Sequence, residues 1–187
     1  AAFSYPMMFA AASRPELVAI TAAMPDSTGL LPVAARFPDR VLDVGIAEQH
    51  AVTSAAGMAM GGLRPVVALY STFLTRAIDQ VNLDVGLHSQ PVVFALDRAG
   101  ITGDDGPSHH GVLDMVLLSK VPDMTIFAPS SHAEVARMLH DALDLCTDGP
   151  AAIRYPKTMP PDPADPELGV CGEGLAARRL RTGSDVC

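Results

Sequence analysis

The chain has 187 residues and a formal net charge of −8, and 49% of its residues are hydrophobic. This composition is typical of a globular domain with a full hydrophobic core and excludes an intrinsically disordered chain. The negative charge argues against a nucleic-acid-binding protein, because no basic stripe is available to neutralise phosphates. No apolar run has the length of a membrane span, so we expect no membrane association.

The cysteines and the chain ends indicate the compartment and the domain limits. The three cysteines are scattered without metal-ligand spacing, so we expect free thiols in the cytoplasm. Residues 1–12 are apolar but lack a basic start and contain Pro6, so we do not interpret them as a signal segment. We expect an irregular leading segment over 1–13, one domain over 14–157, and over 158–187 a Pro-rich linker and the start of a missing C-terminal domain. The chain is therefore expected to be a fragment.

Apolar runs alternate with helical segments along the chain. The runs predict strands at 17–21, 41–46, 65–70, 91–96, 124–128 and 151–155. Helices are predicted at 31–37, 48–61, 73–87, 112–118 and from Ser130 or Ser131 to 145. Because near-continuous apolar strands alternate with helices, the pattern predicts an α/β fold with a doubly wound, mostly parallel sheet and helices on both faces.

An acidic residue stands between the second predicted strand and its helix. Glu48 follows the run VLDVGI and opens a helix rich in Ala, Ser and Gly. One interpretation is an acid that complements the helix dipole. The other is a carboxyl group that hydrogen-bonds a heterocycle nitrogen and passes a proton to it. The second role requires burial among apolar neighbours such as Ile46 and Val52, because desolvation favours the protonated form.

Aromatic, basic and histidine side chains follow three further predicted strands. Ligands of such sheets bind beyond the carboxyl ends of the strands. Phe73 begins a helix there and is either a core aromatic or a platform for a flat ligand ring. Adjacent histidines, His109 and His110, favour substrate hydrogen bonding or proton transfer, although a solvated loop is the simpler interpretation. Candidates for an anion site are Arg76, Arg98, Arg154 and Lys157.

These motifs together resemble the pyrimidine-binding domain of the transketolase-like thiamine diphosphate enzymes. The resemblance extends from about residue 17 to residue 157, and the order of its segments is specific. The segments are DVGIAEQHAV (43–52), GGLRPVVALYSTFLTRAIDQ (61–80), DRAG (97–100), GDDGPSHHG (103–111) and RYPK (154–157).

The resemblance implies a role for each matching residue. Glu48 matches the acid that contacts N1′ of the cofactor's aminopyrimidine ring and promotes the tautomer whose amino group deprotonates the thiazolium carbon. Phe73 matches the aromatic that stacks on this ring, and Arg76 matches an active-site arginine of the cofactor site. The residues that match the substrate site are Tyr70, Arg98, Asp105 and the catalytic His109, together with Lys157, which replaces the usual phosphate-binding Arg. Ser108 and His110 stand where Thr and Gln are more usual.

The cofactors and partners are also implied by the resemblance. Thiamine diphosphate is the expected cofactor, with Mg²⁺ and the diphosphate bound mainly by a separate diphosphate-binding domain that is absent from this sequence. The expected substrates are pyruvate and glyceraldehyde 3-phosphate, and the expected assembly is a homodimer. The chain alone would then hold half an active site and be inactive. The alternatives are transketolase itself, a 2-oxo acid dehydrogenase beta subunit, and a non-catalytic binding or dimerisation module.

Overall fold

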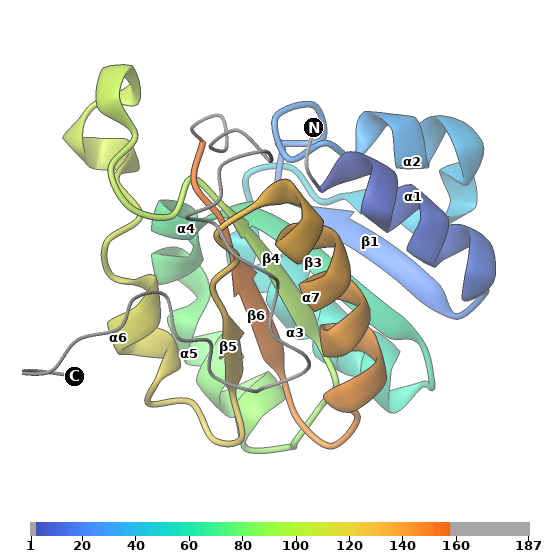
Figure 1. Cartoon of the computed structure of the whole chain (residues 1–187). Helices are drawn as coiled ribbons and strands as arrows, with labels where there is room; N and C mark the ends of the chain where they lie inside the picture. Colours follow the sequence, from blue (N-terminus) through green and yellow to red (C-terminus); the bar gives the residue numbers. More distant parts are fainter. Residues whose placement is uncertain (1–2, 158–187) are drawn as a thin grey trace, which may run out of the picture.

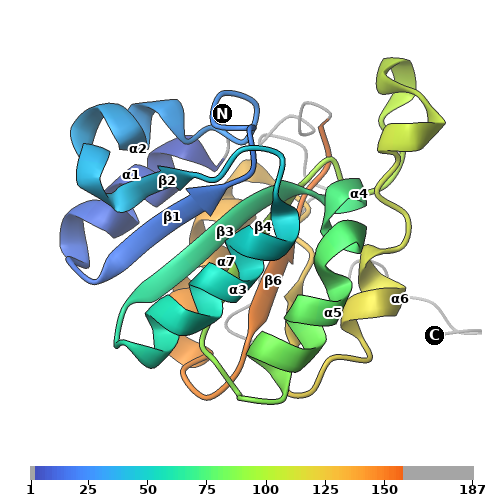
Figure 2. The same ribbon diagram turned by 180° about the vertical axis from the view of Figure 1, so that it is seen from behind.

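The computed structural model describes residues 3–157. These residues form a six-stranded sheet with helices on both faces (Figures 1 and 2). The strand order is β2-β1-β3-β4-β6-β5, and every neighbouring pair is parallel. This confirms the predicted α/β class. The strands are β1 Leu17–Thr21, β2 Val41–Asp43, β3 Arg64–Tyr70, β4 Val93–Asp97, β5 Thr125–Phe127 and β6 Ala151–Arg154.

Helices and shorter turns connect the strands. The α-helices are α1 Ser4–Ser13, α2 Leu31–Arg36, α3 Glu48–Met60, α4 Ser71–Leu74, α5 Ile78–Gln80, α6 Asp114–Leu118 and α7 His132–Leu145. The 3₁₀ turns are η1 Pro38–Arg40, η2 Thr75–Ala77, η4 Gly103–Asp105 and η5 Pro107–His109, and η3 Val81–Gly86 is a π-helical segment. The predicted Ser cap of α7 is present, because the Ser131 side chain accepts a hydrogen bond from the Glu134 N–H.

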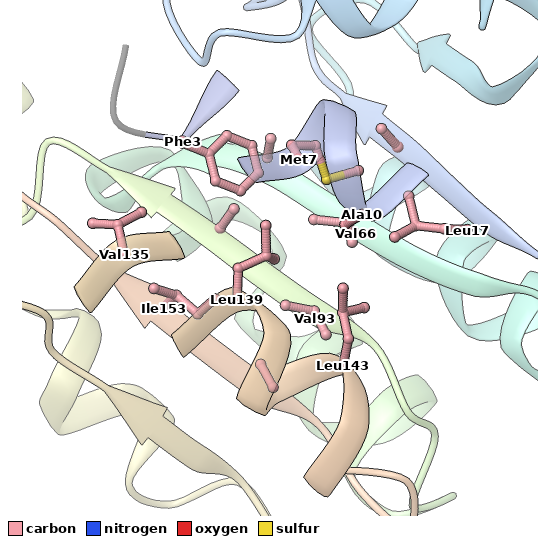
Figure 3. Close-up of a cluster of buried hydrophobic side chains, with 14 of the residues drawn as sticks. Phe3, Met7, Ala10, Leu17, Val66, Val93, Val135, Leu139, Leu143 and Ile153 are labelled. Carbon is pink, nitrogen blue, oxygen red and sulfur yellow. The ribbon is translucent and has the colours of Figure 1, made fainter. Parts of the chain in front are cut away.

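Each face of the sheet has its own apolar core. On one face, α1 and α7 pack against strand residues, with Met7 and Leu139 fully buried over Val66 and Ile153 (Figure 3). On the other face, α3 and the segment from α4 to η3 bury a second set of apolar side chains, which includes Val52, Leu69, Leu74, Val81 and Phe94. Burial on both faces explains why the central strands are almost entirely apolar.

The prediction of an irregular leading segment over 1–13 is wrong for residues 4–13, which form α1. Pro6 lies in the first turn of this helix, where its missing N–H would have no intrahelical partner in any case. The segment is stabilised by burial of one face, since Phe3, Met7 and Ala10 belong to the first core (Figure 3).

The second strand is shorter than predicted. The prediction ran to residue 46, but β2 ends at Asp43. Oδ1 of Asp43 accepts hydrogen bonds from the N–H groups of Ala23 and Gly45, and Gly45 has a φ of +72°. This turn directs the chain out of the edge strand before Ile46, which is 79% exposed. Ile46 therefore does not bury Glu48, contrary to expectation.

The predicted helix over 73–87 is also wrong as a continuous helix. It is divided into α4, η2, α5 and η3, and Ala77 leaves the helical region with φ −120° and ψ 14°. The predicted apolar face is nevertheless present, because Leu74, Val81 and Val85 are fully buried or nearly so. Arg76 lies in η2, the turn that ends at this interruption.

Candidate active site

Glu48 is the first residue of α3 and is almost completely buried, with 2% of its surface exposed. Its Oε1 atom accepts a hydrogen bond from Arg76 Nη1 at 2.6 Å. The second oxygen, Oε2, accepts no hydrogen bond from residues 3–157. Val52, one turn along the helix, is fully buried, as predicted. The carboxyl group is thus oriented through one oxygen and has the other available to a ligand.

An aromatic cluster lies beside this ion pair. The guanidinium carbon of Arg76 lies 4.6 Å from the centroid of the Phe73 ring. The Phe73 and Tyr70 rings are stacked, with centroids 5.4 Å apart and planes 10° from parallel. The ring of His109 meets Phe73 edge-on, with centroids 5.5 Å apart. Residues from the end of β3, from α4 and η2, and from the distant turn η5 therefore converge at the carboxyl edge of the sheet.

A pocket of about 250 Å³ opens at the same edge, and Tyr70, Arg98, Asp105 and His109 line it. These are four of the five residues predicted for the substrate site. The guanidinium carbon of Arg98 lies 3.9 Å from the centroid of the Tyr70 ring, which places the charge on an aromatic face. The pocket thus contains a cation, a carboxylate, a phenol and an imidazole.

Lys157, the fifth predicted substrate residue, is joined to this pocket through Asp105. Lys157 Nζ lies 2.7 Å from Asp105 Oδ1 and 3.1 Å from Asp104 Oδ1. The hydrogen bond from Lys157 lowers the pKa of Asp105, and the hydrogen bond to Asp105 raises the pKa of Lys157. Asp105 Oδ2 also lies 3.4 Å from Arg98 Nε. Asp105 therefore bridges two of the predicted anion-binding cations.

The predicted grouping of four cations is only partly present. Arg154 pairs with Asp114 of α6, whose side chain is 1% exposed, and the distance from Arg154 Nε to Asp114 Oδ2 is 2.8 Å. A buried carboxylate without a partner would be costly, so this pair joins α6 to β6. We correct the expectation for Arg154, because its charge is used in the fold outside the pocket.

The loop that carries Asp105 and His109 projects from the sheet edge (Figures 1 and 2). Its base is closed by two backbone hydrogen bonds between Gly100 and Gly111, of 2.7 and 2.8 Å. Thr72 Oγ1 donates to the Ser108 carbonyl at 3.1 Å, which joins the loop to α4. Of the two adjacent histidines, only His109 lines the pocket, since Nδ1 of His110 hydrogen-bonds Thr102 within the loop.

The sequence analysis missed two residues that support the site. Asp97 holds Arg98 through two hydrogen bonds, and although it begins the resembling segment DRAG, the sequence analysis gave it no role. Gly111 packs so closely that an added Cβ would lie 2.4 Å from Ser71 Oγ and 2.5 Å from the Arg98 carbonyl oxygen. A Gly that follows two histidines gives no sign of this contact.

Residues 3–157 contain neither a cluster of metal ligands nor a membrane-spanning helix. No group of three or more His, Cys, Asp or Glu side chains in this part of the chain is arranged to hold a metal ion. No described helix is long and apolar enough to cross a membrane.

The geometry can be compared with known proteins. Residues 2–162 match the family profile of the pyrimidine-binding domain of transketolase. The chain belongs to this family. Among solved structures, this pyrimidine-binding domain is similar to a split-gene transketolase in an inactive β4 tetramer, with 26% identity and a TM-score of 0.75 over 86% of the chain and 52% of that protein. It also has the fold of transketolase from Leishmania mexicana, with a TM-score of 0.74 over 82% of the chain and 24% of that protein.

Curated relatives are more similar in sequence. A protein of Thermobifida fusca named 1-deoxy-D-xylulose-5-phosphate synthase is 52% identical over 98% of the pyrimidine-binding domain chain. A protein of Mycolicibacterium gilvum with the same name is 53% identical over 100% of it. The chain spans only 29% and 27% of the length of these two relatives.

Proposed function

We propose that this pyrimidine-binding domain is part of a 1-deoxy-D-xylulose-5-phosphate synthase. Such an enzyme is a transferase that decarboxylates pyruvate and joins the remaining two carbons to glyceraldehyde 3-phosphate, in the first step of the non-mevalonate isoprenoid pathway. The product also feeds thiamine and pyridoxal synthesis. Support comes from relatives of that name at 52% and 53% identity. The single observation that carries the proposal is the buried Glu48 carboxyl, oriented by Arg76 with Oε2 without a partner in the described residues.

The residues beside Glu48 fit an aminopyrimidine ring. A ring nitrogen such as N1′ needs one oxygen of a buried carboxyl group, and Glu48 Oε2, which accepts no hydrogen bond from the described residues, is available for it. A flat heterocycle also needs an aromatic platform. The half-buried Phe73 ring lies beside the Arg76 guanidinium group, which is paired with Glu48 Oε1. Glu48, Phe73 and Arg76 would therefore hold the pyrimidine end of thiamine diphosphate.

Thiamine diphosphate, when bound, supplies the carbon nucleophile that adds to the keto group of pyruvate and accepts the electrons released with carbon dioxide. Glu48 would hold a proton at Oε2 and exchange it with the ring nitrogen of the bound cofactor. Arg76 keeps Oε1 occupied, so that the carboxyl group presents only one oxygen to the ring. A general acid or base in this position typically contributes a factor of about 10² to 10⁴ to the rate.

The pocket next to Phe73 is proposed to bind the substrates. Arg98 and Lys157 supply positive charge for a carboxylate or phosphate, although Lys157 lacks the bidentate geometry of Arg. Asp105 and the Tyr70 hydroxyl offer polar contacts to substrate hydroxyl groups. His109 Nδ1 lies 2.9 Å from Ser108 Oγ. When the Ser108 hydroxyl donates to Nδ1, the ring proton is on Nε2, and His109 can donate it to a substrate oxygen.

Further parts of the active site are proposed to lie outside this chain. We propose that Mg²⁺ and the diphosphate are bound by a separate diphosphate-binding domain, that the full-length enzyme is a cytoplasmic homodimer, and that this fragment alone is inactive. The proposal is supported by the length of the relatives, of which the chain spans 27% and 29%. The net charge of −8 gives no support to a nucleic-acid partner.

A substrate panel on the full-length protein tests the reaction. With thiamine diphosphate and Mg²⁺ present, we expect carbon dioxide release from pyruvate that depends on glyceraldehyde 3-phosphate, with formation of a five-carbon ketose phosphate. We expect no ketol transfer from xylulose 5-phosphate to ribose 5-phosphate. The reverse pattern would identify a transketolase, and decarboxylation with acyl transfer to a lipoyl carrier would identify a 2-oxo acid dehydrogenase.

Calorimetry on the 187-residue chain tests the division of the cofactor site. Titration with thiamine diphosphate and Mg²⁺ should give no tight binding, because the diphosphate contacts are proposed to lie elsewhere. Binding as tight as that of the full-length enzyme would contradict the half-site proposal. A full-length protein that binds no thiamine diphosphate would favour a non-catalytic module.

A further inference from the structure

We propose that Asp97 is a positioning residue that fixes the guanidinium group of Arg98 over the substrate pocket. The inference rests on the proposed function, because it takes Arg98 to be a substrate-site cation. It adds a residue that does not line the pocket, since the lining residues are Tyr70, Arg98, Asp105 and His109. Asp97 would act on the substrate only through Arg98.

One carboxylate holds both the main chain and the side chain of the next residue. Asp97 Oδ1 accepts a hydrogen bond from the Arg98 N–H at 2.6 Å, and Oδ2 accepts one from Arg98 Nη1 at 2.8 Å. Asp97 is the last residue of β4 and is 8% exposed, so the sheet itself holds its position. The Arg98 side chain is therefore folded back toward the strand end from which it starts.

The backbone of Arg98 also requires this support. Its φ is +60°, in the left-handed region that is unfavourable for an L-residue with a side chain. The hydrogen bond to Asp97 Oδ1 stabilises this conformation directly, and the Ala99 N–H is fixed by the Tyr155 carbonyl at 3.0 Å. With these restraints the guanidinium carbon lies 3.9 Å from the Tyr70 ring centroid.

The two carboxylates that contact Arg98 differ in their place in the fold and in exposure. Asp105 comes from the projecting loop, is shared with Lys157, and contacts Arg98 at 3.4 Å. An anionic substrate group can take its place on the cations. Asp97 comes from the sheet, and its side chain is half as exposed as that of Asp105, 11% against 23%. Arg98 therefore remains oriented by Asp97 when Asp105 exchanges with a substrate anion.

The test uses the full-length enzyme and compares Asp97→Asn with Asp114→Asn. Asp114 also forms a buried pair with an arginine, Arg154, but outside the pocket. Loss of a hydrogen bond to a charged group corresponds to about 1.5 to 3 kcal/mol. Asp97→Asn should therefore raise KM for glyceraldehyde 3-phosphate about 10- to 100-fold. KM for pyruvate and the Kd of thiamine diphosphate should stay within about twofold of the wild-type values. Asp114→Asn should leave all three unchanged in the folded fraction.

A double-mutant cycle separates positioning from a general structural effect. In an Arg98→Ala background, Asp97→Asn should produce no further rise in KM, because the group that it positions is absent. An equal rise in both backgrounds, or an equal rise for both substrates, would overturn the proposal. If Asp97→Asn does not fold, Asp97→Glu in the same cycle decides between these outcomes. A wild-type enzyme that forms no product from pyruvate and glyceraldehyde 3-phosphate would instead overturn the proposed function.

Discussion

Arg76 Nη1 lies 2.6 Å from Glu48 Oε1, although the two residues are 28 positions apart in the chain. The pair is asymmetric, because the Glu48 side chain is 2% exposed and the Arg76 side chain 46% exposed. The guanidinium carbon of Arg76 also lies 4.6 Å from the centroid of the Phe73 ring. The Arg76 side chain therefore contacts both Glu48, the proposed acid–base group, and Phe73, the proposed aromatic platform.

Replacement of Arg76 should destabilise the fold as well as the site. In Arg76→Met the buried Glu48 carboxylate loses its partner, and removing one member of a buried pair is strongly destabilising. Because Arg76 is partly exposed, we expect a smaller loss, about 1 to 3 kcal/mol in the free energy of unfolding. Urea denaturation of the chain measures it. Arg137→Met, which breaks a pair with Asp141 on α7, is the control and should cost less than about 1 kcal/mol. Equal effects would contradict this account.

Phe73 should matter for cofactor affinity more than for stability. Phe73→Leu removes the flat ring but keeps an apolar side chain of similar size, so we expect a stacking loss of about 0.5 to 1.5 kcal/mol. The Kd of thiamine diphosphate for the full-length enzyme should rise about 3- to 10-fold, as measured by calorimetry. Phe37→Leu is the matched control, because Phe37 also carries a cation on its face, from Arg40 at 4.1 Å, but lies outside the site. The same rise in Kd for both variants would argue against a platform role.

The Lys157–Asp105 pair should produce a defined pH dependence. Lys157 lowers the pKa of Asp105 below its ordinary 3.8, so the stabilisation from Asp105 is present above pH 3.8 and is lost as the pH falls through the lowered pKa. The pKa of Lys157 is raised above 10.5. The stabilisation from the Lys157 charge is therefore present below pH 10.5 and is lost as the pH rises through the raised pKa. In Lys157→Met the Asp105 pKa should move up toward 3.8, which carboxyl ¹³C NMR of the chain can follow. An unchanged Asp105 pKa would show that the pair does not persist in solution.

Gly111 should tolerate no side chain. In Gly111→Ala the new Cβ would meet Ser71 Oγ at 2.4 Å and the Arg98 carbonyl oxygen at 2.5 Å. Such overpacking typically costs about 1 to 3 kcal/mol. Gly57→Ala is the control, since nothing lies within 4 Å of its added Cβ and Ala in a helix is more stable than Gly by about 0.5 to 1 kcal/mol. In thermal unfolding, Tm should therefore fall for Gly111→Ala and rise for Gly57→Ala. Shifts of the same sign would be inconsistent with these contacts.

Local pattern predicted the sheet well because burial on both faces leaves a strong signature. The apolar runs that contain Val66–Leu69 and Val93–Leu96 became central strands with all of these residues buried. The junction that places Glu48 at the start of α3 was also correct. The end of β2 was not predictable in the same way, because it depends on Asp43 accepting hydrogen bonds from Ala23 and Gly45.

Contacts between distant segments account for the other differences. Pro6 suggested a broken leading segment, but packing of Met7 and Ala10 against the sheet decides in favour of α1. The candidate site was predicted residue by residue, and Tyr70, Arg98, Asp105 and His109 do meet in one pocket. The pairing of Arg154 with Asp114 was not predictable, since it joins residues 40 positions apart. Charge type can be read from sequence, whereas the choice of partner requires the fold.

The central claim is that Glu48 exchanges a proton with the cofactor's pyrimidine ring. Glu48→Gln in the full-length enzyme tests this claim most directly. Glutamine keeps the size and can still form hydrogen bonds through its amide oxygen and NH₂ group, but it cannot exchange a proton as a carboxyl group does. We predict that kcat for carbon dioxide release from pyruvate falls about 10²- to 10⁴-fold, while Asp79→Asn, an exposed acid near Arg76 in sequence, leaves kcat unchanged. A folded, cofactor-loaded Glu48→Gln enzyme with the wild-type kcat would contradict the account.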